Sequence, residues 1–161
     1  MIILGIDPGI ARTGYAILKQ ENNSIVLKDC GCITTKPTSD LALRLVEIKK
    51  DVTTLIKKWQ PEALCLESLF FATNAKTAMV VGQARGVVML TAGEHQLKIL
   101  EVTPLQVKIS TTGYGKADKA QVQRMVQTLL KLKKIPKPDD AADAAAIAWA
   151  GLSRYKFEKL K

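Results

Sequence analysis

Two acidic residues close short apolar runs of the sequence, where a buried strand would normally carry another Val or Ile. Asp7 ends the run MIILGID, and Glu67 ends the run ALCLE. An ionised carboxylate in a buried strand loses several kcal/mol of solvation unless a cation or hydrogen-bond donors replace the water. Each acid taken singly could instead lie in water at the end of its strand or cap a turn. The rest of the acidic pattern therefore decides between the two interpretations.

A third acidic element is the segment DDAADAAAIA near the C-terminus. Asp140 and Asp143 are three residues apart, so both project from one face near the start of a helix. The alanines around them let the backbone of this helix approach a sheet closely. Compensation of the helix dipole accounts for Asp139 and Asp140 in a first turn. It explains Asp143 less well, because that position lies deeper in the helix.

If the sheet places Asp7 beside Glu67, four carboxylates converge. Such a cluster is stable at neutral pH only with bound cations. Hard oxygen ligands of this kind suit Mg²⁺ or Mn²⁺. Two such ions about 4 Å apart can activate a water and stabilise the leaving oxygen of a phosphodiester in an in-line displacement. The acidic pattern thus predicts two Mg²⁺ ions per site, with Mn²⁺ able to substitute.

The chain carries a strong excess of positive charge. It has 24 Lys and Arg residues against 15 Asp and Glu, a formal net charge of +9 and a pI near 9.5. Many basic domains are simply soluble proteins, but this surplus favours an anionic partner. Nucleic acid fits best, because phosphates bind distributed Lys and Arg through counterion release, whereas a membrane partner requires a strongly amphipathic cationic helix. Carboxylates and basic surface together predict a nuclease.

Size and cysteine content narrow the setting. Residues 1–161 are about the usual length of one domain, so we expect a single nuclease domain. Cys30, Cys32 and Cys65 cannot form a complete disulfide framework and imply a reducing compartment. A zinc site is disfavoured, since the only histidine, His95, lies in a polar turn. Without a basic signal region or an apolar run of roughly 20 residues, we expect a cytoplasmic protein with no membrane partner.

The order of the elements indicates an α/β fold. Apolar runs bounded by turn residues predict strands, the first three forming a meander, at residues 1–7, 14–20, 25–35, 63–68 and 97–102. Apolar spacing predicts a helix that Thr38 or Ser39 caps and that ends before Pro61. Further helices are predicted over about 74–91, from Thr103 and Pro104 onward, over 122–130, and over 139–155. This order predicts a mixed sheet with helices on both faces.

Five motifs occur in the order, and at about the spacing, found in the RuvC family of bacterial Holliday junction resolvases. They are GIDPG with the following TGYAIL, LESLFFATN, GQARG, GYGKADKAQVQRMV and DDAADAAAIA. They cover nearly the whole chain, which is identified by this resemblance as a member of the family. The resemblance implies a ribonuclease H-like fold with a five-stranded mixed sheet, and a homodimer that cuts four-way junction DNA symmetrically in recombination and repair. It also suggests RuvA and RuvB, the branch-migration proteins, as partners.

Carried over position by position, the resemblance makes Asp7, Glu67, Asp140 and Asp143 the catalytic, metal-binding acids. Some relatives have His at the first position of the last pair, so Asp140 makes this chain similar to the all-carboxylate version. Asp139 is an extra neighbour that we expect to be solvated or to support the ligands.

The resemblance also assigns DNA contacts to three lysines. Lys108 in LQVK and Lys119 in KADK are expected to approach the junction phosphates near the active site, where Lys119 also takes part in catalysis. Lys116 is expected to assist them. A solvated surface position is the alternative for each, as it is for most lysines.

Two aromatic residues follow Glu67 directly in a loop. The resemblance implies that Phe70 contacts bases at the crossover, where its ring can stack on an unpaired base, while Phe71 is expected to pack in the core. Gly82 and Gly86 lie four residues apart and permit close approach to the sheet or to a partner. The resemblance implies that the dimer contact lies on the helix predicted over about 74–91, which contains both glycines.

Two other classes of protein remain as alternatives. A D-x-G strand with a Gly-rich turn also opens the actin-like and sugar-kinase fold, but those ATP-dependent enzymes need two lobes, and 161 residues supply one. A DNA-binding or scaffold protein with purely structural acids would lack metal-dependent cleavage of a four-way junction. The resolvase-like proteins of ribosomal RNA processing share the D-x-G opening, but their other motifs are not recognised in the second half of this chain.

Overall fold

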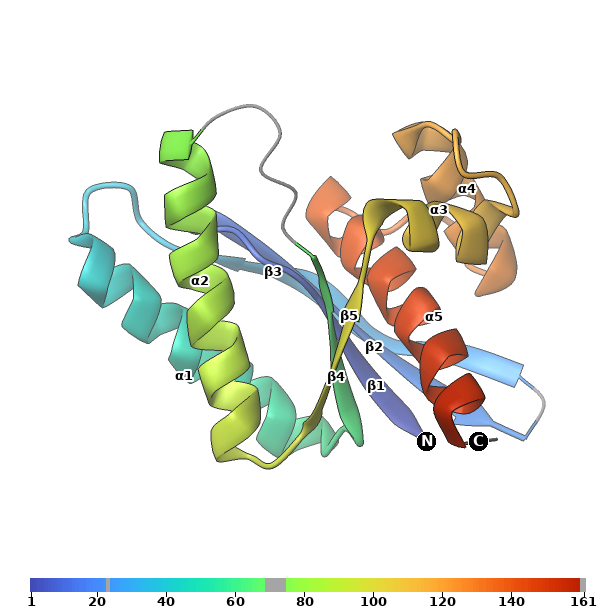
Figure 1. Cartoon of the computed structure of the whole chain (residues 1–161), viewed down its shortest axis with the longest axis horizontal. Helices are drawn as coiled ribbons and strands as arrows, with labels where there is room; N and C mark the ends of the chain where they lie inside the picture. Colours follow the sequence, from blue (N-terminus) through green and yellow to red (C-terminus); the bar gives the residue numbers. More distant parts are fainter. Residues whose placement is uncertain (23, 69–74, 160–161) are drawn as a thin grey trace.

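The structure is a computed structural model that describes residues 1–22, 24–68 and 75–159. A five-stranded sheet lies between two layers of helices (Figure 1). Its strand order is β3-β2-β1-β4-β5. The strands are β1 (Ile2–Asp7), β2 (Arg12–Glu21), β3 (Ser24–Thr34), β4 (Ala63–Glu67) and β5 (Lys98–Val102). The predicted α/β class and the mixed five-stranded sheet are confirmed.

The first three strands form the predicted antiparallel meander, and the last two run parallel to β1. Parallel neighbours need crossover connections, which the two helices α1 (Leu41–Trp59) and α2 (Ala75–Glu94) supply. The central strands β1 and β4 are buried on both faces, as their continuous apolar sequences predict. Both strands therefore end at the same edge of the sheet, where their acidic residues lie.

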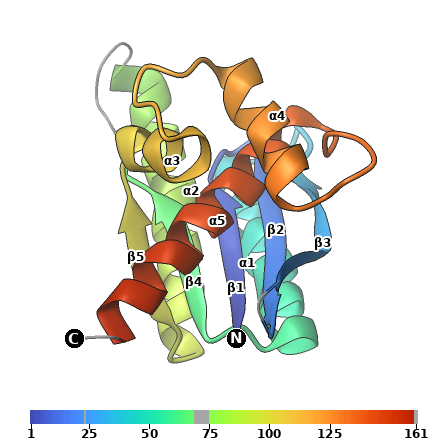
Figure 2. The same ribbon diagram turned by 90° about the vertical axis from the view of Figure 1, so that its right-hand side faces the viewer.

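The helices divide between the two faces of the sheet (Figures 1 and 2). Helices α1 and α2 pack against one face over a core of large aliphatic side chains. The other face carries α3 (Pro104–Thr112), α4 (Lys119–Leu129) and α5 (Asp139–Lys159), and its core is rich in alanine. Figure 2 shows α5 crossing the strands obliquely, with α3 and α4 near its N-terminal half.

Caps were predicted for two helices, and a third helix has a cap that was not predicted. Thr103 caps α3 with a complete capping box, as predicted, and Asp118 caps α4 in the same way. The predicted cap of α1 is wrong: the helix begins at Leu41 after Asp40, which makes no side-chain cap hydrogen bond. Thr38 and Ser39 lie in the preceding turn, where the amide of Ser39 donates to the carbonyl of Lys36. A Ser/Thr signal located the region of the start but not the capping residue.

Small residues let α5 lie directly on the sheet. A Cβ atom added to Gly14 would overlap the backbone carbonyl of Asp140. A Cβ atom on Gly5 would lie 2.6 Å from the Cβ of Ala148, which is closer than real Cβ atoms approach. The predicted close approach of the alanine-rich helix is confirmed, and it depends on glycines in the strands as well.

The state of the cysteines and the apolar length of the helices bear on two further expectations. All three cysteines are free thiols. Burial raises the pKa of Cys65 to about 12, so this thiol stays protonated and packs as a small apolar residue. Within the described ranges, no helix is long and apolar enough to cross a membrane.

Candidate active site

The strand register places Asp7 and Glu67 next to each other. β1 and β4 are parallel, and their last paired residues are Ile6 and Leu66, one position before the two acids. Side chains alternate between faces along a strand. Ile6 and Leu66 point into the core under α1 and α2, so Asp7 and Glu67 point to the face that α5 covers.

Helix α5 adds the other two acids from above. Gly14 is paired with Asp7 across β1 and β2, and the backbone of Asp140 lies directly on Gly14. The first turns of α5 are thereby held over the end of β1. Asp143 follows one turn later and lines the same pocket as Asp7 and Glu67. Three of the four predicted acids, Asp7, Glu67 and Asp143, thus line one pocket at this edge of the sheet.

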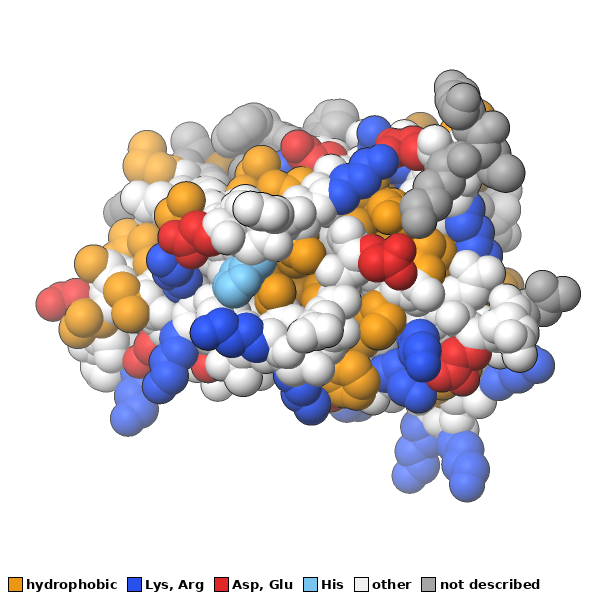
Figure 3. All heavy atoms as spheres, turned by 90° about the horizontal axis from the view of Figure 1, so that it is seen from below, with side chains coloured by type: hydrophobic (Ala, Val, Ile, Leu, Met, Phe, Trp, Pro, Cys, Tyr) orange, Lys and Arg blue, Asp and Glu red, His pale blue; other side chains and the backbone are white. Residues whose placement is uncertain are grey.

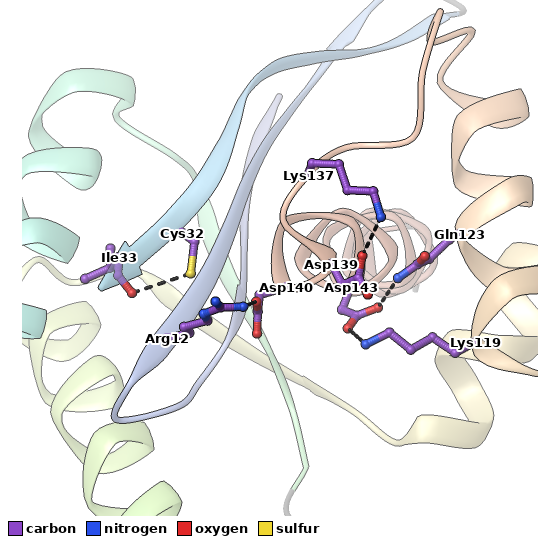
Figure 4. Close-up of polar contacts among 9 residues, drawn as sticks. All are labelled: Arg12, Cys32, Ile33, Lys119, Gln123, Lys137, Asp139, Asp140 and Asp143. Atoms are coloured by element: carbon purple, nitrogen blue, oxygen red, sulfur yellow. Dashed lines mark hydrogen bonds and ion pairs between the residues drawn. The ribbon is translucent and has the colours of Figure 1, made fainter. Parts of the chain in front are cut away.

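The carboxylates of α5 are engaged by side chains from two directions (Figure 4). One oxygen of Asp143 lies 2.7 Å from the ammonium of Lys119, and the other accepts a hydrogen bond of 3.2 Å from Gln123. On the opposite side, the guanidinium of Arg12 lies 3.6 Å from Asp140. The acidic cluster therefore sits between a lysine of α4 and an arginine at the start of β2.

An open pocket of about 250 Å³ gives access to the acids. Its polar lining consists of Asp7, Glu67, Asp143, Lys108 and Lys119. Its apolar walls are Pro104, Val107, Val122, Ala146 and Ile147 from α3, α4 and α5. Two of the three predicted phosphate-binding lysines thus share a pocket with three of the four predicted acids.

The other predicted site residues lie elsewhere. Asp140 is beside the pocket, paired with Arg12, and is not among the lining residues. Lys116 is exposed and does not line the pocket. Asp139 accepts a hydrogen bond of 2.8 Å from Lys137 and is half exposed, which agrees with a solvated role. Phe70 and Phe71 lie outside the described residues.

Burial and mutual repulsion act on the strand acids. Burial, together with the charges of Asp143, Glu67 and Asp140, raises the pKa of Asp7 to about 7 against the opposing charge of Lys119. The pKa of Glu67 is raised by burial and by Asp143, against the opposing charge of Lys108. Without an added cation, Asp7 therefore retains a proton to a much higher pH than a carboxyl group in water does.

The donor set fits a hard divalent cation in kind and charge, because it consists of carboxylates that repel one another. The side chains are not arranged as a closed metal site: among the described residues, no three His, Cys, Asp or Glu are grouped so that they could hold one ion. The reason is visible in the contacts. Asp143 is turned to Lys119 and Gln123, and Asp140 is turned to Arg12, so protein cations neutralise these acids.

Sequence reasoning missed three residues of the site. Gln123 lies four positions after Lys119, so both fall on one face of α4, and this spacing could have identified it. Arg12 follows the PGIA turn after Asp7, but only the fold shows that it meets Asp140. Gly14 carries no chemical group, and its role as the contact for α5 depends entirely on tertiary structure.

The sheet order, the acids at the ends of β1 and β4, and the acids on the covering helix define a nuclease-type domain with the ribonuclease H-like fold. A family model for crossover junction endodeoxyribonuclease RuvC matches residues 3–150. The chain belongs to this family, whose enzymes are in general metal-dependent nucleases.

Individual relatives agree with this assignment. The chain is 53% identical over 160 residues to the crossover junction endodeoxyribonuclease RuvC of Alkaliphilus metalliredigens, covering 99% of this chain and 98% of the relative. It is 52% identical over 148 residues to that of Alkaliphilus oremlandii, covering 92% and 90%. The structure of Thermus thermophilus RuvC in complex with a Holliday junction substrate superposes with a TM-score of 0.93 at 31% identity, covering 98% of this chain and 96% of that one.

Proposed function

We propose that this chain resolves Holliday junctions as a structure-specific endodeoxyribonuclease, with residues 1–161 forming one nuclease domain. The observation that carries the proposal is the pocket in which Asp7, Glu67 and Asp143 face Lys108 and Lys119. It combines acids for cations with lysines for phosphates, in a chain of net charge +9. The relative from Thermus thermophilus, which is solved with a Holliday junction, supports the choice of substrate.

In this proposal, Asp7, Glu67, Asp140 and Asp143 hold two Mg²⁺ ions, for which Mn²⁺ can substitute. When bound, these ions supply the Lewis acid that activates water and stabilises the leaving oxygen. Asp7, whose pKa is raised, and Asp143, which lies against Lys119, would both contribute carboxylate oxygens to these ions. The ends of β1 and β4 and the first turns of α5 bring these four residues to one edge of the sheet.

The lysines bind and orient the DNA. Lys119 is 60% exposed, and its hydrogen bond to Asp143 raises its pKa, so it stays protonated in the free protein. Its exposed ammonium, which lies beside the acids, would contact the phosphate that is cut and stabilise the charge that develops there. Lys108 reaches the pocket from α3 and contacts a neighbouring phosphate, and the exposed Lys116 supports it from outside.

Preference for a junction requires symmetry and a group that detects unstacked bases, because phosphate contacts exist on every duplex. A homodimer supplies two equivalent sites for two symmetric cuts. Exposed apolar side chains along the paired helices α1 and α2 support such a contact: Leu43, Val46, Met79 and Leu90 are 58–69% exposed. Phe70 is proposed as the base sensor, and RuvA and RuvB as partners in recombination and repair.

The proposal is tested with a synthetic four-way junction that carries a label on each strand. We expect paired, symmetrically placed nicks in the presence of Mg²⁺, none after chelation, and recovery when Mg²⁺ or Mn²⁺ is added back. A linear duplex of the same sequence is the matched control and should remain uncut. Tight junction binding without any metal-dependent nick would instead identify a non-catalytic DNA-binding protein.

A further inference from the structure

The positive charge of the chain is concentrated in one segment. Residues 104–138 contain eight of the 24 Lys and Arg residues but only one of the 15 acidic residues, Asp118. This segment, which comprises α3, α4 and the connection to α5, thus carries seven of the nine net positive charges. By contrast, the face in Figure 3 shows Lys, Arg, Asp and Glu side chains intermixed around an apolar strip. Within the segment, Lys108 and Lys119 line the active-site pocket, and four further lysines lie in the loop before α5.

These four, at positions 131, 133, 134 and 137, define the lysine loop, residues 131–137. The loop has a fixed shape: the side-chain amide of Gln127 donates to the carbonyls of Leu132 and Lys133, at 3.3 Å each. The amide of Leu132 donates back to the carbonyl of Gln127 at 2.9 Å. Leu132 packs against the core under α5, and Pro136 is buried. Leu132 and Pro136 thus face inward, and the lysines of the loop are exposed to solvent.

Three of the four exposed charges of the loop are not neutralised by the protein, whereas Lys137 pairs with Asp139. Lys131, Lys133 and Lys134 are exposed, and none pairs with an acid in the part of the chain that the structure describes. Elsewhere, five lysines each pair with a carboxylate: Lys19, Lys28, Lys49, Lys58 and Lys98. The dipole of α4 accounts for a cation only near its last turn. Lys133 and Lys134 lie beyond the helix end at Leu129, so the dipole does not explain them.

The loop is also close to the catalytic acids. Lys134 and Asp140 are six positions apart in the sequence, which limits the distance between their Cα atoms to about 20 Å. Along one DNA strand, this distance corresponds to about six phosphates. Figure 2 shows the loop extending beyond the sheet. A duplex that has a phosphate at Lys119 and runs toward this side therefore comes within reach of the loop.

We propose that the lysine loop is a second DNA-binding surface, which holds the phosphates of a duplex arm of the junction about three to eight nucleotides from the cut. This inference rests on the proposed function for its substrate. It assigns the loop to arm binding and not to chemistry, so loss of its charges lowers affinity and leaves the cleavage step unchanged.

The test compares two triple variants that each remove three positive charges. Lys131→Gln/Lys133→Gln/Lys134→Gln removes the exposed charges of the loop. The matched control Lys36→Gln/Lys50→Gln/Lys57→Gln removes three exposed lysines at or before α1, on the other face of the sheet. We expect the loop variant to bind a four-way junction about 10-fold more weakly, with a salt slope shallower by about 0.9 per lost phosphate contact. The control should change affinity less than about 2-fold, and saturated single-turnover cleavage should be unchanged in both variants.

Neutral methylphosphonate linkages then locate the contact. Placed in one arm, they should weaken binding of the wild-type protein but cause no further loss in the loop variant, since the same contact is already missing. Placed at the crossover, their effect should add to that of the loop variant. Equal losses in loop and control variants, or additive losses along the whole arm, would refute the inference. If the wild-type protein binds but does not cut the junction, the proposed function fails, and the binding cycle still decides the role of the loop.

Discussion

The two faces of the sheet are packed by opposite means. Under α1 and α2, the core consists mainly of large aliphatic side chains, which hold those helices away from the strands. Under α5, seven buried alanines and the strand glycines Gly5 and Gly14 bring backbone against backbone. The aspartate side chain is short, so an acid on a helix reaches an acid on a strand only where the two backbones are this close. The candidate active site therefore lies on the face whose core has the smaller side chains.

The largest loss of cleavage is expected when one of the acids under α5 is replaced. Asp7→Asn keeps the shape of the side chain but removes the charge that holds a cation, so cleavage of a four-way junction should fall at least about 10³-fold. Junction affinity should change little, because Lys108 and Lys119 remain. The matched control is Asp139→Asn, at an exposed acid paired with Lys137, which should cut at a near-normal rate. Near-normal cleavage by Asp7→Asn would remove this residue from the active site.

The second largest effect is expected at the contact between β2 and α5. Gly14→Ala places a Cβ atom in the backbone of Asp140, so α5 must move, and unfolding free energy should fall by about 3 kcal/mol. Displacing the acids by about 1 Å should also slow cleavage about 100-fold. Thermal denaturation and single-turnover cleavage measure the two effects.

Gly93→Ala in α2 is the control, since nothing lies within 4 Å of a Cβ atom at that position. It should be neutral or stabilise the helix by up to about 1 kcal/mol. Equal losses of stability and of cleavage in the two glycine variants would contradict the difference in packing between the two faces.

A pH dependence of stability follows from the burial of Asp7 and from the repulsion among the acids. The pKa of Asp7 is about 7 in the folded protein against an ordinary value of 3.8, so the folded state holds the proton more tightly than the unfolded state does. Its contribution is therefore fully present below about pH 4 and is lost as the pH rises through 7. Relative to Asp7→Asn, the metal-free wild-type protein should lose up to about 4 kcal/mol over this range.

Denaturant unfolding at several pH values, with a chelator present, measures this difference. Mg²⁺ should reduce it, because a bound cation favours the ionised carboxylate. A constant stability difference between wild type and Asp7→Asn from pH 4 to pH 8 would contradict the raised pKa.

The smallest effect is expected on the other face. Ile48 is fully buried between α1 and the sheet, so Ile48→Val should lower the unfolding free energy by about 1 kcal/mol. Cleavage at a temperature well below unfolding should be unchanged, because the large side chains around the cavity do not position the acids. A cleavage defect in Ile48→Val without aggregation or unfolding would show that the two faces are coupled.

Most of the fold could be predicted because each element carries its own local signal. The apolar runs that form β1 and β4, the meander, and the capping residue Thr103 were all visible in the sequence. The start of α1 was misplaced because Thr38, Ser39 and Asp40 are all suitable capping residues and side-chain identity does not rank them.

The candidate site likewise combines residues that a local sequence signal reveals with contacts that no local signal reveals. Acids at the ends of apolar strands are conspicuous because burying a charge is costly, so Asp7 and Glu67 could be selected from sequence. The ion pairs of Asp140 with Arg12 and of Asp143 with Lys119 join residues more than 20 positions apart. Such pairs depend on how helices and turns meet in space, and no local pattern of charges specifies them.

Three close contacts, here called notches, fix the position of helix α5 on the sheet, and in each of them a glycine leaves room for the opposite residue. Asp140 rests on Gly14 of β2, Ala148 rests on Gly5 of β1, and Gly151 rests on Cys65 of β4, where an added Cβ atom would lie 2.5 Å from that of Cys65. The outer two notches are about 17 Å apart along the helix axis. The helix can therefore act as a lever with its fulcrum at β1: a methyl group added at Gly151 would lift one end and tilt the acids at the other. A cleavage defect in Gly151→Ala, at a site far from the pocket and with junction binding retained, would be the mark of this mechanical link.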